Sequence, residues 1–244
     1  MDPPPAVKAA QDGDADYFVR LSDPEILALL QARDEDGRGL LHALAASASP
    51  EPLRAVIEGH KDLDLIDLIN RADDEGWTPL HSASSAGRTE AVSLLLSLGA
   101  DASARTSQRR LPLHYAASKG HAEIVRALLA AHPKGAKARD ALGATPLHRA
   151  AGGGSWAAAE ALLAAGAQLE ALDARSATPL LLAAASGRRE VALRLAARGA
   201  DVEAEDDEGE TPLGAAAAAS RPLREALAQL AKGETTLDDL LEEE

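Results

Sequence analysis

The chain of 244 residues has a formal net charge of −14, and 46% of its residues are hydrophobic while only 2% are aromatic. A core built from Ala, Leu and Val favours closely packed short helices over a β-sandwich. The absence of cysteine excludes disulfides and thiolate chemistry, and no run of 18 apolar residues could span a membrane. The first residues, MDPPPAVKAA, lack the basic and apolar regions of a signal peptide, so we expect a soluble intracellular protein.

A degenerate motif recurs seven times along the chain. Its last six copies begin 39, 33, 34, 33 and 33 residues apart, a periodicity typical of repeat proteins. The longest interval contains EGHKDLDLIDLIN (residues 58–70), which predicts an extended loop or an extra helical turn. The copies are PAVKAAQDGD from Pro5, GLLHALAASA from Gly39, TPLHSASSAG from Thr78, LPLHYAASKG from Leu111, TPLHRAAGGG from Thr145, TPLLLAAASG from Thr178 and TPLGAAAAAS from Thr211.

Each unit has the pattern of two short helices joined to the next unit by a polar hairpin. In the third unit, Thr78 can cap the first helix and Pro79 fits its first position, where a missing N–H costs no hydrogen bond. Gly87 can end that helix in a left-handed conformation. The stretch TEAVSLLLSLGA (residues 89–100) then predicts a second helix from its apolar period. The polar stretch ADDEGW (residues 72–77) represents the connecting hairpin, which we call the finger.

The Thr-Pro-Leu-His-x-Ala motif at a period of 33 residues resembles the ankyrin repeat over residues 5–233. The resemblance implies an all-α repeat solenoid of about seven helix pairs with β-hairpin-like fingers. We expect a single domain over residues 1–233, followed by an acidic C-terminal tail at 234–244. The units are expected near residues 5–38, 39–77, 78–110, 111–144, 145–177, 178–210 and 211–233.

A histidine occupies the same position of the motif in four units, and we interpret it as structural. Metal ligands would cluster locally rather than occur once per repeat. An imidazole at this position can hydrogen-bond backbone groups across the turn and join adjacent repeats. Where the position holds Leu181 or Gly214, that bond is expected to be missing. The four histidines are His42, His81, His114 and His148.

Other possible chemical signals are weak, so we predict no catalytic residue, metal or cofactor. GGGS (residues 152–155) falls at the turn between two helices and lacks the Lys-Ser/Thr of a phosphate-binding loop. His121, beside Gly120, fits a polar residue at a helix start better than a base. The acidic pairs Asp73–Asp74 and Asp206–Asp207 are expected to be exposed on fingers, with no buried pocket to raise a pKa.

Charge is distributed in bands along the sequence. Residues 1–80 carry a net charge of −10, residues 81–200 carry +7, and residues 201–244 carry −11. One interpretation is that these are ordinary solvated faces with a disordered acidic tail. The other is a banded surface that steers a partner of opposite banding.

Three stretches are similar to the gankyrin family of ankyrin-repeat proteins: EGWTPLHSASSAGRTE (75–90), LPLHYAASKGHAEI (111–124) and ATPLHRAA (144–151). This resemblance implies an assembly chaperone of the 26S proteasome regulatory particle. Its concave face would hold the C-terminal domain of a base ATPase subunit and hinder premature docking on the core particle. It further implies a monomer of the cytoplasm and nucleus. The implied contact residues are Asp36, Arg38, Asp74, Trp77, Arg88, Tyr115, Lys119 and Arg149.

The sequence also departs from that family and leaves other functions open. The Leu-x-Cys-x-Glu motif that animal gankyrins use toward the retinoblastoma protein is replaced by Leu182-Ala-Ala-Ala-Ser186, so that activity is not inferred. A general ankyrin adaptor or a kinase-inhibitor-like regulator with another client is the alternative. A nucleic-acid partner is disfavoured, because the basic middle segment lacks interleaved aromatics and its acidic flanks would repel phosphate.

Overall fold

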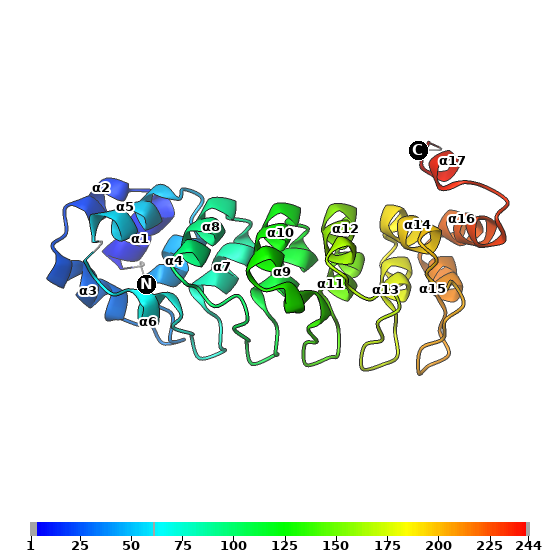
Figure 1. The fold of residues 1–244 in the computed structure, drawn as a ribbon, viewed down its shortest axis with the longest axis horizontal. Helices are drawn as coiled ribbons and strands as arrows, with labels where there is room; N and C mark the ends of the chain where they lie inside the picture. Colours follow the sequence, from blue (N-terminus) through cyan, green and yellow to red (C-terminus); the bar gives the residue numbers. More distant parts are fainter. Residues whose placement is uncertain (1–3, 61, 243–244) are drawn as a thin grey trace. The chain divides into compact units, whose positions relative to one another are not determined.

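The computed structural model describes residues 4–60 and 62–242, and within this part of the chain the regular elements are 17 α-helices and one 3₁₀ helix (Figure 1). The all-α repeat architecture predicted from the sequence is therefore confirmed. The chain divides into two compact units, Met1–Pro112 with Ala130–His132, and Leu113–Leu129 with Pro133–Glu244. None of the described helices is long and apolar enough to cross a membrane.

The first unit contains the three N-terminal helices, two complete helix pairs and the insertion of the second repeat. The first helices α4 and α7 pack side by side, and α1 packs against α4. The predicted extra helical turn in the long second repeat is present as α6. The elements are α1 (Pro5–Asp12), α2 (Ala15–Val19), α3 (Asp23–Gln31), α4 (Leu40–Ala46), α5 (Glu51–Gly59), α6 (Ile66–Ile69), α7 (Pro79–Ala86) and α8 (Thr89–Ser97).

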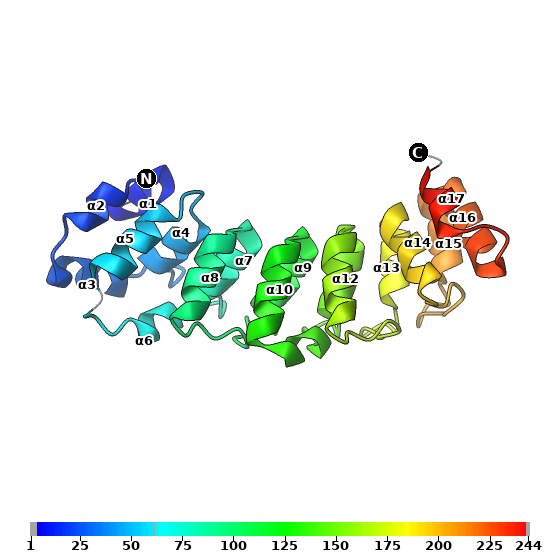
Figure 2. The same ribbon diagram turned by 45° about the horizontal axis from the view of Figure 1, so that its top comes forward.

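The second unit contains the remaining helix pairs. Helix α13 packs between α11 and α15, while α14 packs between α12 and α16, so first helices and second helices form two adjacent rows (Figure 2). The fingers project beyond the first helices (Figure 1). The elements are α9 (Pro112–Lys119), α10 (Ala122–Ala131), η1 (Pro133–Lys137), α11 (Pro146–Gly153), α12 (Trp156–Ala164), α13 (Pro179–Ala185), α14 (Arg189–Ala197), α15 (Pro212–Ala219), α16 (Arg221–Lys232) and α17 (Leu237–Glu242).

The motif residues set the helix ends as expected from their backbone chemistry. Pro79 is the first residue of α7, and Thr78 before it has an extended backbone. Gly87 ends the helix with a φ of 73°, a left-handed conformation that favours glycine. Helix α11 ends in the same way at Gly154, with a φ of 83°.

Small side chains allow neighbouring first helices of the second unit to approach closely. Ala150 on α11 and Ala183 on α13 are completely buried. A Cβ atom added at Gly153 would lie 2.4 Å from the backbone oxygen of Ser118, so only glycine fits there. The glycine-rich GGGS stretch therefore lies at the turn only from Gly154, because Gly152 and Gly153 are the last residues of α11 and serve helix packing.

Part of the acidic tail is folded. Residues 237–242 form α17, where Leu240 is buried and its backbone oxygen accepts a 2.9 Å hydrogen bond from Arg189 Nη2 on α14. The interpretation of this tail as disordered is therefore wrong for these residues. Burying Leu240 and pairing its carbonyl stabilise the segment despite its charge.

Candidate protein-interaction surface

His42, His81 and His148 each join a first helix to the finger that follows it. The Nδ1 atom of His81 lies 3.2 Å from the backbone nitrogen and 2.9 Å from the hydroxyl of Thr78. Its Nε2 atom lies 3.1 Å from the backbone oxygen of Arg110, which is 29 residues ahead. His148 repeats this arrangement with Thr145 and, at 3.0 Å, with the Ala177 oxygen.

These contacts fix the tautomer of the histidines. A carbonyl oxygen can only accept, so Nε2 must carry the hydrogen, and Nδ1 accepts from the backbone N–H. Burial lowers the pKa of His81 to about 4. Burial also lowers the pKa of His42 and of His148. The rings are neutral structural links, not bases.

Repeats without the histidine cap their helices differently. The hydroxyl of Thr178 accepts from the backbone nitrogen of Leu181 at 3.2 Å. The hydroxyl of Thr211 likewise accepts from Gly214 at 3.0 Å. The start of each helix is therefore capped. Leu181 and Gly214 have no side-chain N–H group that could donate to the next finger, as the sequence predicts.

Most of the described fingers are built around the carboxylate of a recurring aspartate, and in the finger before Leu111 the hydroxyl of Thr106 takes its place, accepting from the backbone nitrogen of Arg110 at 3.3 Å. In the second finger, Asp73 Oδ1 accepts from the backbone nitrogens of Glu75 at 3.0 Å and Trp77 at 2.7 Å. Such side-chain-to-backbone bonds are typical of Asx turns. The same pattern occurs at Asp34, Asp140, Asp173 and Asp206.

The expectation that the pair Asp73–Asp74 is exposed is wrong for Asp73. Its side chain is 2% exposed, whereas that of Asp74 is 69% exposed. The carboxylate of Asp73 accepts hydrogen bonds from two N–H groups of the turn and from the Arg38 guanidinium, and these bonds offset the cost of removing its charge from water. Asp140 is buried in the same way, and its role was also missed. The signal was available, because these aspartates recur with the period of the motif.

The candidate contact residues on the first two fingers belong to the first unit. Arg38 Nε donates a 3.1 Å bond to Asp73 Oδ2, so this guanidinium is partly engaged within the protein. Asp74 lies 3.7 Å from Arg33 Nη2, and its backbone nitrogen donates to the Asp36 oxygen at 3.1 Å. The structure therefore brings Asp36 and Asp74 together on adjacent fingers, both exposed to solvent.

Trp77 and Arg88 lie at the two ends of α7. The indole nitrogen of Trp77 donates to Ser82 Oγ at 2.8 Å, and its ring lies 5.5 Å from that of His81. Trp77 is half-buried, so part of its surface is accessible. Arg88 Nε donates to the backbone oxygen of Ala46 at 3.1 Å, which caps the end of α4. Arg88 thus has a structural contact in addition to any binding role.

The three remaining candidates belong to the second unit. Arg149 on α11 donates from both Nε and Nη2 to Asp140 Oδ2, and its side chain is 23% exposed. Tyr115 on α9 is half-buried. Lys119, the last residue of α9, is exposed, and no described carboxylate forms an ion pair with it. Lys119 is therefore the most available charge of this group.

The fingers and first helices offer a binding surface. Among residues 4–60 and 62–242, no three His, Asp or Glu side chains are placed to hold a metal ion. The exposed side chains sit on fingers and first helices that are held by hydrogen bonds between repeats. Such a preformed surface can bind another protein with little ordering cost.

Comparison with known families agrees with this architecture. A profile of ankyrin repeats, three copies long, matches residues 7–106 and 98–173, which together span more than half of the chain. The chain belongs to the ankyrin-repeat family. The predicted fold class, a solenoid of ankyrin repeats, is thereby confirmed, and the protein is a protein-binding scaffold.

Individual relatives match shorter segments. The chain is 44% identical over 69 residues to the 26S proteasome non-ATPase regulatory subunit 10 of Dictyostelium discoideum, a match that covers 28% of either chain. It is 34% identical over 76 residues to protein phosphatase 1 regulatory subunit 27 of Homo sapiens and of Mus musculus, covering 31% of this chain and 46% of theirs. The matches thus span less than half the length of each relative. Both kinds of relative are regulatory subunits, which points to a non-catalytic binding protein.

Proposed function

We propose that this protein is an assembly chaperone of the 26S proteasome regulatory particle. In this proposal its fingers and first helices hold the C-terminal domain of a base ATPase subunit. The observation that carries the proposal is the 44% identity to a proteasome non-ATPase regulatory subunit. The residue types at Trp77, Tyr115, Lys119 and Arg149 support it, because the general repeat does not require them.

The eight candidate residues contribute unequally in this proposal. Asp36 and Lys119 are exposed charges without an ion pair among the described residues, so they are available to a client. Arg38 and Arg149 face the buried carboxylates of Asp73 and Asp140. Breaking such an ion pair would leave a buried carboxylate without its partner, which costs stability. These arginines are therefore expected to contact a client in the orientation that they have here.

Affinity purification with quantitative mass spectrometry tests the proposal in cells. The tagged full chain should enrich proteasome base ATPases. Lys119→Glu should reduce that enrichment, because it places like charge against a client carboxylate. Arg126→Glu on α10 is the matched control, since Arg126 is also exposed but lies on a second helix. Absence of base ATPases from the wild-type sample would contradict the proposal.

A regulator of another client is the second candidate. The 34% identity to protein phosphatase 1 regulatory subunit 27 favours a phosphatase over other clients. In the same purification, this candidate predicts enrichment of a phosphatase catalytic subunit without proteasome subunits. The two candidates are therefore separated by one experiment.

A further inference from the structure

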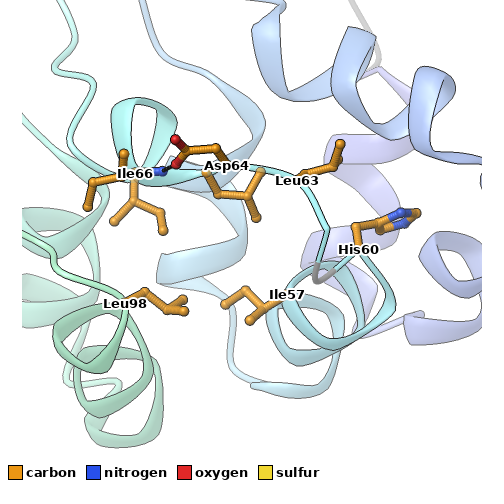
Figure 3. Close-up of a pocket in the computed structure, with 8 residues that line it drawn as sticks. Ile57, His60, Leu63, Asp64, Ile66 and Leu98 are labelled. Atoms are coloured by element: carbon orange, nitrogen blue, oxygen red, sulfur yellow. Dashed lines mark hydrogen bonds between the residues drawn. The ribbon is translucent and has the colours of Figure 1, made fainter.

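The insertion in the second repeat forms an apolar groove within the first unit. A depression of about 400 Å³ lies between the end of α5, residues 63–65, α6 and the end of α8. Leu98 and Ile57 point toward each other across it (Figure 3). Leu65 and Ile69 are buried, while Ile66 remains 40% exposed. An exposed isoleucine in an apolar depression leaves surface that a partner can cover.

The groove is held in shape from both sides. His60 is buried, and its Nδ1 atom lies 2.5 Å from Asp23 Oδ1 on α3. Its ring points away from Ile57 and Leu98 (Figure 3), so His60 lines the groove at one side while it ties the end of α5 to α3. On the other side, the Asn70 amide donates to the backbone oxygens of Ile66 and Gly99 at 3.1 Å each. A preformed groove reduces the ordering cost of binding.

Glycine at position 99 lets α6 close against the end of α8. A Cβ atom added at Gly99 would lie 2.9 Å from Ile66 Cδ1. Gly99 also has a φ of 89°, which disfavours other residues. The position of Ile66 in the groove is therefore set by local backbone geometry.

The charge around the groove is acidic. The sequence of residues 57–69 contains four carboxylates and one basic residue, Lys61, which lies outside the described residues. The four carboxylates are exposed, and Asp64 lines the groove itself. The nearby Arg54 is engaged with Glu51 and Glu58, at 3.9 and 3.8 Å. The carboxylates are Glu58, Asp62, Asp64 and Asp67.

We infer that this groove docks a short segment of another protein that presents apolar side chains flanked by lysine or arginine. The apolar floor selects the apolar side chains, and Asp64 together with the neighbouring exposed carboxylates selects the basic flanks. A small-molecule cofactor fits less well, because such sites need several convergent polar groups. A second copy of the same groove would bring carboxylates against carboxylates. This inference does not depend on the proteasome proposal.

A phage-displayed library of random 12-residue peptides tests the inference on the full chain. Wild-type protein should enrich peptides with apolar residues beside Lys or Arg. Their synthetic forms should bind at least about tenfold more weakly to Ile66→Ser in fluorescence anisotropy, since the central apolar contact is lost. Asp64→Asn should weaken binding about two- to fivefold at low salt and little at high salt.

Val19→Ser is the matched control, because Val19 is 65% exposed in the same unit but lies on α2. It should leave peptide affinity unchanged. The inference is overturned if no enriched peptide depends on Ile66, if the enriched peptides are acidic, or if Val19→Ser weakens binding equally. Concentration-dependent dimerisation that Ile66→Ser abolishes would also overturn it, since a second copy would then fill the groove.

Discussion

At the scale of the residue, one imidazole connects two repeats. His148 accepts from the backbone nitrogen of Thr145 and donates to the oxygen of Ala177, while being fully buried. Replacing His148 leaves the buried Ala177 carbonyl without its hydrogen-bond donor. The leucine at position 181 shows how another repeat tolerates the loss of this hydrogen bond. There the threonine hydroxyl caps the helix instead.

We predict that His148→Leu destabilises the protein less than His148→Ala. The alanine variant should cost on the order of 1–3 kcal/mol for the unpaired groups, with a further loss from the cavity. The leucine variant keeps apolar volume and allows Thr145 to cap the helix. Urea unfolding followed by circular dichroism measures both values. Equal destabilisation would show that the side-chain volume does not matter here.

The buried histidines should also make stability depend on pH. His81 keeps its neutral form in the folded protein, with a pKa of about 4 against an ordinary value of 6.5. Below about pH 6.5, His81 binds a proton in the unfolded chain but stays neutral in the folded chain. The free energy of unfolding therefore falls as the pH drops toward 4. Between pH 7.5 and 5.5 this histidine should account for roughly 1.3 kcal/mol of lost stability.

Urea unfolding of wild type and His81→Leu at both pH values measures this contribution. The variant should lose about 1.3 kcal/mol less than wild type between pH 7.5 and 5.5. The same dependence on pH in both proteins would mean that His81 is not the titrating group.

At the scale of the element, a finger is organised by its aspartate. Asp140 Oδ1 accepts from the backbone nitrogens of Leu142 and Ala144, and Oδ2 pairs with Arg149. One carboxylate thus shapes the turn and orients a candidate contact residue on α11. Adjacent fingers are joined by backbone bonds, such as that from Ala174 nitrogen to Leu142 oxygen at 2.9 Å.

Substitutions at Asp140 should separate these two roles. Asp140→Ala removes the turn bonds and the ion pair, and we expect a loss of roughly 3 kcal/mol. Asp140→Asn retains a carbonyl for the turn and should cost less, although it removes the charge that holds Arg149. Thermal unfolding compares them. A greater loss for asparagine than for alanine would contradict the turn-forming role.

Local features of the repeats could be predicted from sequence, whereas long-range pairings could not. Thr78, Pro79 and Gly87 determine the ends of α7 through their own backbone chemistry, so the helix was predictable. The partner of Arg38 lies 35 residues away, and several nearby carboxylates were equally plausible. The folding of the acidic tail depends on packing against α14, which its composition does not reveal.

At the scale of the whole molecule, stability is distributed over local interfaces between repeats. Helix α15 packs on α13 and α16 packs on α14, so the last repeat is supported chiefly by the sixth. In such arrays a local weakening spreads mainly to the neighbouring repeat.

We predict that Leu227→Ala weakens the last repeats selectively. Leu227 on α16 is completely buried, and its truncation should cost about 2–4 kcal/mol locally. Hydrogen exchange should show the greatest loss of protection in α15 and α16, less in α13 and α14, and none in α4 and α7. Uniform loss of protection in all helices would contradict the modular account.

We propose that exposed charges on the fingers and first helices bind a proteasomal ATPase domain. The most direct measurement is calorimetric titration of the full chain with purified C-terminal domains of the base ATPases, at low and high salt. We predict that one domain binds wild type, that Lys119→Glu weakens binding about tenfold or more at low salt, and that Arg126→Glu has little effect. Failure of every domain to bind, or equal weakening by both variants, would contradict the account.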